Sequence, residues 1–333
     1  ILNMVLEERV GEGFTTAKDL MWRLRTQGGL AQEVAHGYRT LKGMVDDPDC
    51  TVFMTMSGAM TIAKMGLVTC EMIDRGMAQY VASTGALIAH GLVESVGLKH
   101  FKHDPRFNDE QLGEEKLNRV TDTLEPEENL NEVATVIGQV LDTISGDEPI
   151  SPSIFNRMIG QHLHEHYPGQ RGILKSAFER KVPVCIPAFV DSEVGNDVFT
   201  HNKARERDGR RKIIMDMEFD SQVLMDLFVN AKRRGIFSIG GGVPRNNTQN
   251  VAPLIEIMNA RLGTNVPEAT FDTGCRICPD PMWYGHLSGC TYSENASWRK
   301  MDPQAILQGK FAEVHGDATM IWPFIIRAIM DAA

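Results

Sequence analysis

A lysine close to a tryptophan, near the C-terminal end of the chain, is the pair best suited to chemistry. Lys300 closes the segment Glu294-Asn295-Ala296-Ser297-Trp298-Arg299-Lys300. An indole wall desolvates an ammonium and the neighbouring Arg299 charge also opposes protonation, so both effects lower the pKa of the lysine. A neutral lysine amine is a nucleophile that forms imines with carbonyl-like carbons. The alternative is that Lys300 is one of 34 basic residues on a solvated surface.

The composition describes an ordinary globular protein. Of its 333 residues, 42% are hydrophobic and 23% are charged, which is typical of such chains. No run approaches the roughly 18 to 20 apolar residues that a membrane span needs, and no signal-peptide pattern opens the sequence, so we expect a cytoplasmic protein. The formal charge of −10 disfavours a nucleic-acid partner and would attract a small polycation to acidic pockets.

The six cysteines are too sparse and uneven for a disulfide framework, and we expect reduced thiols. Cys275 and Cys278 have a zinc-like spacing, and His286 and Cys290 follow them. No second close pair completes such a site, so the sequence predicts no metal centre.

Short apolar runs alternate with helical patterns along most of the chain. We expect strands at 51–56, 79–82, 181–187, 213–217, 236–239, 269–272 and 311–315. About seven strands that alternate with helices predict an α/β fold with a doubly wound, mostly parallel, Rossmann-like sheet and helices on both faces. Residues 1–50 are predicted to form a helical segment in which Thr16 caps a helix, and 51–333 a single domain. The polar stretch 98–131 is expected to be a surface excursion.

Small or acidic residues follow several of these strands, at the carboxyl edge of the predicted sheet. They are Ser57, Ser83-Thr84-Gly85, Asp191, Gly240-Gly241-Gly242 and Asp317. Exposed backbone N–H groups and helix N-termini at such an edge bind ligands, although small residues there also allow close helix packing. Asp191, Glu193 and Asp197 form either a solvated loop or a cluster that holds an amine. No G-x-G-x-x-G occurs, so a nucleotide site would be of a non-standard Rossmann kind.

From about residue 50 to the C-terminus, the chain resembles the deoxyhypusine synthase family, which includes the homospermidine synthases. Two segments carry most of this resemblance: Ser297-Trp298-Arg299-Lys300 is similar to the family's S-W-G-K, and Val314-His315-Gly316-Asp317-Ala318 to its V-Y-A-D-A. Three others support it, namely Pro187-Ala188-Phe189-Val190-Asp191 for P-A-x-x-D, the triple glycine, and Ser83-Thr84-Gly85 for T-T-A-G. The order and spacing of all five agree with the family.

The resemblance implies an NAD-dependent transferase of aminoalkyl groups. NAD would take a hydride from spermidine, Lys300 would attack the resulting imine and release 1,3-diaminopropane, and an amine would accept the aminobutyl group. The expected acceptor is a small amine such as putrescine or agmatine. Two alternatives stay open: deoxyhypusine synthesis on a lysine of a translation factor, and an impaired NAD-binding paralogue that acts as a partner subunit. The resemblance also implies a homotetramer with shared active sites.

Residue by residue, the resemblance implies that Lys300 is the nucleophile, that Trp298 walls the polyamine stem and keeps the lysine dry, and that Glu294 binds a terminal ammonium. The other implied substrate-binding residues are Asn246, His90, Asp197 and Asn196. The implied NAD-binding residues are Ser57, Ser83, Thr84, Gly85, Asp191, Gly240, Gly242, Ser288, Asp317 and Ala318.

Several positions depart from the family pattern. Asn246-Asn247 stand where protein-modifying members have two histidines, which removes a proton shuttle. In the segment Tyr284–Gly289, which corresponds to the family's D-G-S-D-S-G, Leu287 replaces an acidic residue. Asn196 stands at another position where the family has an acid, and His90 stands where many members have a glutamate. Arg299 replaces the glycine of S-W-G-K. Fewer anionic anchors predict a different amine donor or acceptor rather than a different fold.

Overall fold

The computed structural model describes residues 16–332, which form two compact units. The first unit contains the chain up to Met56, Met77–Tyr80 and the chain from Val223 onwards, and the second contains Ser57–Gly76 and Val81–Gln222. Residues on both sides of position 50 thus belong to the first unit. The part of the predicted segment 1–50 before residue 16 lies outside the described residues. No helix within residues 16–332 is long and apolar enough to span a membrane.

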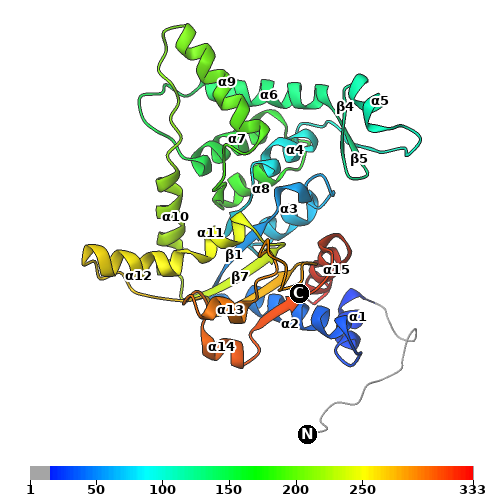
Figure 1. Cartoon of the computed structure of the whole chain (residues 1–333), viewed down its shortest axis with the longest axis vertical. Helices are drawn as coiled ribbons and strands as arrows, with labels where there is room; N and C mark the ends of the chain where they lie inside the picture. The colour runs from blue at the N-terminus through cyan, green and yellow to red at the C-terminus, as the bar shows by residue number, and fades with distance from the viewer. Residues whose placement is uncertain (1–15, 333) are drawn as a thin grey trace. The chain divides into compact units, whose positions relative to one another are not determined.

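Four parallel strands make up the sheet of the first unit. They are β1 (Cys50–Met56), β7 (Arg233–Ile239), β8 (Thr273–Ile277) and β9 (Phe311–Val314), in that order, and β1 and β7 lie side by side in Figure 1. The register pairs Met56 with Ile239, Ile239 with Ile277, and Ile277 with Val314. The strands thus end level with one another, so the segments that follow β7, β8 and β9 leave the same edge.

Aromatic side chains fill the core on both faces of this sheet. Phe53 of β1 packs against Phe228 of α10 (Met217–Asn230) and against Phe271. Phe237 of β7 points to the opposite face, because neighbouring strand residues alternate, and packs against Trp322 of α15 (Ala318–Met330). Burying these large rings contributes much of the favourable free energy of this core.

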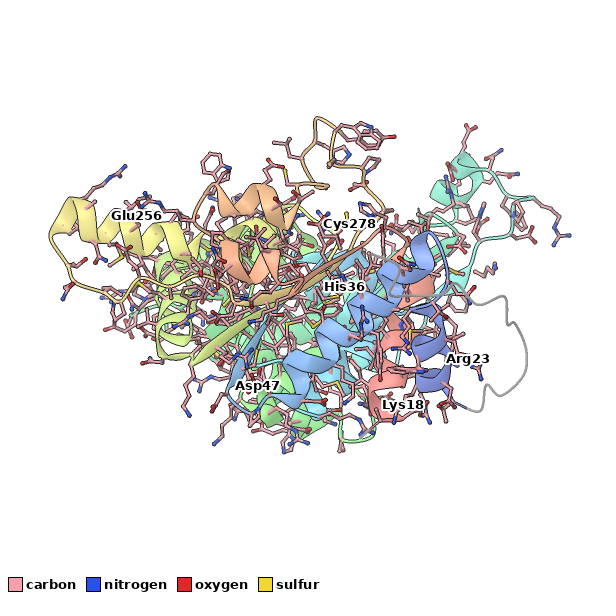
Figure 2. All side chains as sticks on the ribbon, turned by 90° about the horizontal axis from the view of Figure 1, so that it is seen from below. Lys18, Arg23, His36, Asp47, Glu256 and Cys278 are labelled. Atoms are coloured by element: carbon pink, nitrogen blue, oxygen red, sulfur yellow. The ribbon has the colours of Figure 1, made fainter. Side chains whose placement is uncertain are left out.

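The N-terminal helices belong to the first unit. Thr16 caps α1 (Ala17–Leu24) in a capping box with Asp19, which confirms the predicted helix start. Figure 2 shows α1, which carries Lys18 and Arg23, beside α2 (Leu30–Asp46), and α1 also packs on α15. The remaining helices of this unit are α11 (Val243–Gln249), α12 (Val251–Leu262), α13 (Tyr292–Ala296) and α14 (Pro303–Leu307).

The second unit contains two short sets of strands. β2 (Tyr80–Ala82) pairs in parallel with β6 (Val184–Cys185) through Val81 and Ala82. A separate antiparallel sheet has the order β3 (Phe101–Lys102), β5 (Thr123–Pro126), β4 (Leu117–Val120). The helices of this unit are α3 (Gly66–Asp74), α4 (Ala86–Ser95), α5 (Asp109–Glu114), α6 (Glu127–Asp142), α7 (Pro152–His166), α8 (Ile173–Arg180) and α9 (Glu193–Arg207), with the 3-10 turn η1 (Gly58–Met60).

The structure corrects some sequence predictions. Six parallel strands are present within residues 16–332 rather than about seven, because the strand expected at 213–217 does not form. Met215 makes only an isolated bridge with Ile150, since the side chain of Asn202 bonds both backbone polar groups of Ile213 that a sheet ladder would need. The expected 98–131 surface excursion contains the antiparallel sheet, and β8 begins one residue after the strand predicted at 269–272.

Candidate active site

A cavity of about 580 Å³ in the first unit contains the lysine singled out in the sequence. Asn246, Glu294, Trp298 and Lys300 all line it, together with Gly242. These residues come from the segment after β7, from α11, and from α13 and the turn that follows it. Folding therefore brings three of the predicted substrate-binding residues to the predicted nucleophile.

Lys300 is buried, with only 6% of its surface exposed. Its Nζ donates a hydrogen bond to Asn246 Oδ1 at 3.1 Å and lies 5.9 Å from the centre of the Trp298 ring. Burial lowers the pKa of this lysine, and the positive charge of Arg245 lowers it further. The solvated-surface alternative is thus wrong, and the amine is held in conditions that favour its neutral, nucleophilic form.

Arg299 has a different role from the one its sequence position suggests. Its side chain pairs with Glu256 of α12, so the charge that lowers the pKa of Lys300 comes from Arg245 instead. The backbone of Arg299 has φ +56°, in the left-handed region that glycine adopts most easily. This conformation explains why the related S-W-G-K motif has a glycine at the position where this chain has Arg299.

Trp298 and Glu294 both remain open to solvent. The tryptophan is 64% exposed, so within the first unit it does not by itself keep Lys300 dry. Glu294 lies in the first turn of α13, where its backbone N–H donates to Thr291 Oγ1 at 3.0 Å. Its exposed carboxylate lies near the Cys290 thiol, at 3.5 Å from Sγ, and is available to an ammonium group in the cavity.

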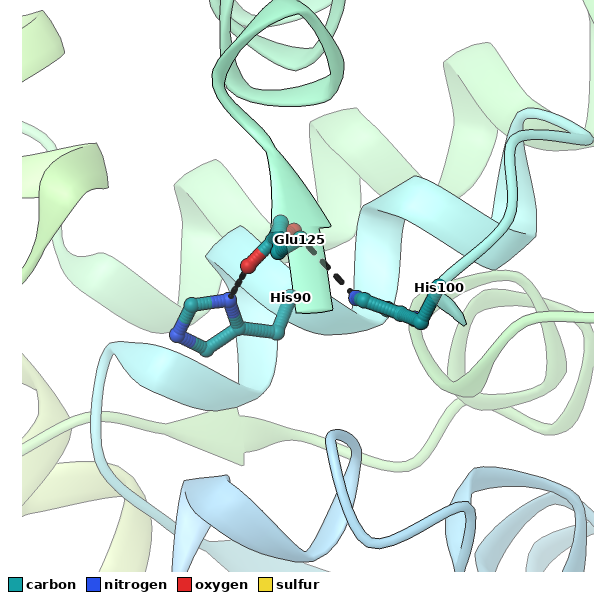
Figure 3. A group of neighbouring side chains, drawn as sticks. All are labelled: His90, His100 and Glu125. Carbon is teal, nitrogen blue, oxygen red and sulfur yellow. Dashed lines mark hydrogen bonds and ion pairs between the residues drawn. The ribbon is translucent and has the colours of Figure 1, made fainter. Parts of the chain in front are cut away.

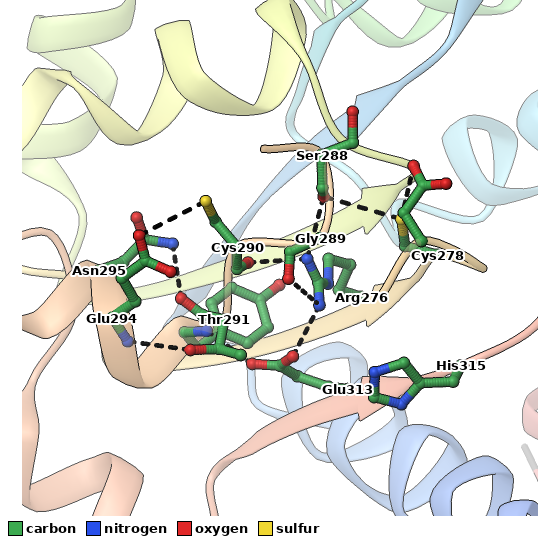
Figure 4. A network of polar contacts seen from close by, with 12 residues as sticks. Arg276, Cys278, Ser288, Gly289, Cys290, Thr291, Glu294, Asn295, Glu313 and His315 are labelled. Atoms are coloured by element: carbon green, nitrogen blue, oxygen red, sulfur yellow. Dashed lines mark hydrogen bonds and ion pairs between the residues drawn. The ribbon is translucent and has the colours of Figure 1, made fainter. Parts of the chain in front are cut away.

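Two buried arginines hold the loop that lines one side of the cavity, and Figure 4 shows one of them, Arg276, against this loop. Arg245 of α11 and Arg276 of β8 each donate to the Cys290 carbonyl at 2.7 Å. Arg276 also pairs with Glu313 at 2.6 Å, and Glu313 accepts the Tyr292 N–H at 2.6 Å. Sequence reasoning missed both arginines, although an arginine inside the apolar strand around residue 276 is a signal for a buried charge that must be paired.

All six cysteines are free thiols, as expected. Burial raises the pKa of Cys275 to about 12, so its thiol stays protonated at neutral pH. Cys275 lies in β8 and Cys278 directly follows it, and the group of candidate metal ligands found among residues 16–332 includes neither of them.

Glycine and acidic residues at the sheet edge of the first unit fit a phosphate-bearing cofactor such as NAD. Gly240 and Gly242 have φ +81° and +78°, and a Cβ on either would meet no atom within 4 Å, so the backbone is open to a ligand. Gly241, in contrast, packs against Ser288. Asp317 caps α15 by accepting the Thr319 N–H at 2.8 Å, and Ala318 begins the helix. An open glycine turn and a helix N-terminus at one edge are features that bind pyrophosphate.

The remaining predicted cofactor residues lie in the second unit. Thr84 Oγ1 accepts the Gly58 N–H at 3.2 Å, next to Ser57, while a Cβ on Gly85 would fall 2.2 Å from Ser192, next to Asp191. Ser83, which directly follows β2, is fully buried. The structure thus brings the three turns that contain Ser57, Ser83–Gly85 and Asp191 side by side.

The other predicted substrate residues also lie in the second unit. Asp197 belongs to α9 rather than to a loop, and burial, with a contribution from Glu193, raises its pKa to about 6. Asn196 precedes it and is exposed. His90 of α4 contacts Glu125 at 2.5 Å, a partner that sequence reasoning did not identify.

A family model described as deoxyhypusine synthase matches residues 19–329. The chain belongs to the deoxyhypusine synthase family. Members of this family are NAD-dependent aminobutyl transferases, and the chain is accordingly a transferase of aminoalkyl groups. The resemblance seen in the sequence is confirmed, and it extends further than expected, because the match includes α2 and most of α1.

Relatives in the deoxyhypusine synthase family are distant but cover most of the chain. A probable deoxyhypusine synthase 2 of Methanosarcina acetivorans is 29% identical over 94% of this chain and 86% of its own. A deoxyhypusine synthase-like protein of Chlorobaculum tepidum is 29% identical over 85% of this chain and 77% of its own. The crystal structure of a putative deoxyhypusine synthase from Entamoeba histolytica has the same fold, with a TM-score of 0.64, 13% identity and 97% coverage of both chains.

Proposed function

We propose that this protein transfers the aminobutyl group of spermidine, through an imine on Lys300, to a small amine such as putrescine. The observation that carries the proposal is the state of Lys300, a buried amine whose pKa is lowered and which lines a cavity large enough for a polyamine. A catalytically impaired paralogue would not need to bury a lysine, because burying an ammonium costs free energy.

Bound NAD supplies the hydride chemistry, since it can accept a hydride from the amine donor and return it to the product. In the first unit Gly240, Gly242, Ser288, Asp317 and Ala318 are the residues we propose to hold it. The open glycine turn would let backbone N–H groups approach the pyrophosphate, and Asp317 would bind ribose hydroxyls. In the second unit Ser57, Ser83–Gly85 and Asp191 are proposed for the same role from the family resemblance.

Lys300 acts on the oxidised donor. Its neutral Nζ attacks the carbon of the donor's C=N bond, the C–N bond to 1,3-diaminopropane breaks, and that amine leaves with a proton. The aminobutyl group is then held on Lys300 as an imine. The amine of the acceptor attacks the same carbon and releases Lys300, and reduction of the new imine completes the product.

The cavity side chains position the amines. Asn246 Oδ1 accepts a hydrogen bond from Nζ at 3.1 Å, which orients the lysine without adding charge. Glu294 is proposed to bind a terminal ammonium by a charge-assisted hydrogen bond. Trp298 presents an aromatic face to the cavity, suited to the methylene stem of a polyamine and to its cationic groups.

The acceptor distinguishes the two candidate reactions. Glu294 is the one carboxylate among the described residues that line the cavity, and Asn246 offers no titratable ring. The single carboxylate favours a small amine over a reaction that needs several anionic anchors, while His286 is the one imidazole among the described residues of the cavity lining. The second candidate, deoxyhypusine synthesis on a protein lysine, is favoured by the names of relatives such as that of Methanosarcina acetivorans.

We also propose that the protein assembles as a homotetramer with shared active sites, on the basis of the family resemblance. Sedimentation of the full chain at assay concentration tests this point. A fully active monomer would overturn it.

The test of the function traps the imine. The protein is incubated with NAD and spermidine, reduced with borohydride and examined by peptide mass spectrometry. We expect an aminobutyl adduct on Lys300 and release of 1,3-diaminopropane, and neither in Lys300→Ala. An adduct on another lysine, or diaminopropane released by Lys300→Ala, would overturn the assignment. Adding putrescine, agmatine or a translation-factor substrate to the unreduced complex then shows which acceptor removes the group.

A further inference from the structure

Three side chains that can bind a metal ion converge in the second unit (Figure 3). His90 comes from α4, Glu125 from β5, and His100 directly precedes β3. Each residue offers one ligand atom, and the three atoms lie within 4.8 Å of one another. They form the one such group of His, Cys, Asp or Glu found among residues 16–332.

The Glu125 carboxylate lies between the two imidazole rings. Its Oε2 is 2.5 Å from His90 Nδ1, and its Oε1 is 3.2 Å from His100 Nε2. Figure 3 shows the two rings directed at the carboxylate from opposite sides. Neighbouring ligands of a tetrahedral ion with metal–ligand bonds of about 2.0–2.1 Å lie roughly 3.4 Å apart, so only small side-chain movements would fit these atoms around one ion.

A cation at this point would stabilise the buried carboxylate of Glu125. The side chains of Glu125 and His100 are 1% and 0% exposed, and that of His90 is 14% exposed. A buried carboxylate needs a positive partner to offset its desolvation. The partly exposed edge of His90 provides a route by which an ion can enter.

The ligands are held by surrounding structure. Glu125 lies in β5, where it pairs with Asn118 of β4, and His90 lies within a ten-residue helix. His100 Nδ1 is 2.8 Å from Lys64 Nζ, and Lys64 pairs with Glu94 at 2.6 Å. Lys64 Nζ can only donate, so His100 Nδ1 accepts this bond, and the contacts of Lys64 with both Glu94 and Nδ1 fix the orientation of the His100 ring.

We infer that His90, His100 and Glu125 bind one divalent transition-metal ion, with Zn²⁺ the best match. Two imidazole nitrogens and one carboxylate oxygen form a ligand set that Zn²⁺ accepts with one further position open. Such an ion would connect α4, β5 and the segment before β3, and would stabilise the second unit. The site does not depend on the reaction proposed for Lys300, and it gives His90 a different role from the predicted substrate contact.

The test measures metal binding by the full chain after chelator treatment. We expect wild type to bind one equivalent of Zn²⁺ in competition with a chromophoric chelator, with a rise in Tm. Co²⁺ should give d–d absorption without thiolate charge-transfer bands, because no cysteine is a ligand. Glu125→Gln and His90→Gln should each weaken binding by more than about 100-fold, beyond the about 10- to 100-fold loss expected for an outer-shell change such as Glu94→Gln.

A matched control separates this site from surface histidines. His162 and His166 of α7 stack with ring centres 4.4 Å apart and form a pair that can bind metal weakly. Replacing both with glutamine should leave the affinity for the one tightly bound equivalent of Zn²⁺ unchanged. Wild type without a tight equivalent would overturn the inference, as would thiolate bands in the Co²⁺ spectrum. It would also fail if His90→Gln, a change at a partly exposed side chain, bound Zn²⁺ as tightly as wild type.

Discussion

The hydrogen bond between Lys300 and Asn246 offers a direct test of the nucleophile's charge state. Asn246→Asp keeps the size of the side chain and places a carboxylate about where Oδ1 now lies, 3.1 Å from Nζ. The new negative charge favours the ammonium form of Lys300 and so raises the pKa of the lysine. Because only the neutral amine attacks an imine, the variant should form the Lys300 adduct more slowly at neutral pH.

The size of the effect follows from the distance. Two unit charges 3.1 Å apart interact with roughly 5 kcal/mol at an effective dielectric constant of about 20. Asn246 is exposed at the edge of the cavity, so about half of that value, roughly 2.5 kcal/mol, is a fair expectation after solvent screening. At 1.36 kcal/mol for each tenfold change, the rate of adduct formation should fall by about 70-fold.

The assay is single-turnover adduct formation, quenched with borohydride and measured across a range of pH. Raising the pKa of Lys300 keeps the amine protonated to higher pH, so the pH–rate curve of Asn246→Asp should move to the alkaline side and approach wild type there. Asn246→Ala is the matched control, because it removes the hydrogen bond without adding charge and should cost only about 1 kcal/mol. Equal rates for Asp and Ala at every pH would refute the reasoning.

Two further predictions concern stability. Arg276→Met should destabilise the protein by about 3–5 kcal/mol in urea unfolding, because Arg276 is 1% exposed and its loss leaves Glu313 without a cationic partner. Adding Glu313→Gln should restore part of the loss, and a double variant less stable than Arg276→Met would contradict this explanation. Burial raises the pKa of Asp197 from 3.8 to about 6, so the ionised carboxylate destabilises the folded state above that pH. Asp197→Asn should therefore raise the free energy of unfolding at pH 8 by about 1 kcal/mol after solvent screening, with a higher Tm. This gain should disappear near pH 4. An equal gain at both pH values would contradict the role of ionisation.

Much of the secondary structure could be predicted from local patterns. The helix start predicted at Thr16 is the capped start of α1, and the strand expected at 51–56 is β1 with one added residue. The prediction failed at 213–217, where the apolar run has the composition of a strand. The strand does not form there because the side chain of Asn202, which belongs to α9, hydrogen-bonds the backbone N–H and C=O of Ile213.

The identity of the nucleophile could also be predicted, but its surroundings could not. Lys300 stands in a recognisable motif, whereas Asn246 and Arg245, which bond it and lower its pKa, are more than fifty residues away in sequence. The adjacent Arg299 instead points to Glu256. Neighbours in sequence are thus a poor guide to the charges around a buried amine, because the turn at residue 299 directs successive side chains to different parts of the unit.

The sequence by itself determined the alternation of strands and helices, the glycine turn after β7 and the motif that contains Lys300, because each depends on residues close together in the chain. Only the tertiary structure decided that Lys300 is buried, that Arg245 and Arg276 hold the cavity loop, and that His90, His100 and Glu125 meet. These features depend on which elements pack together. Burial and charge pairing are properties of that packing, and no local pattern of residues contains them.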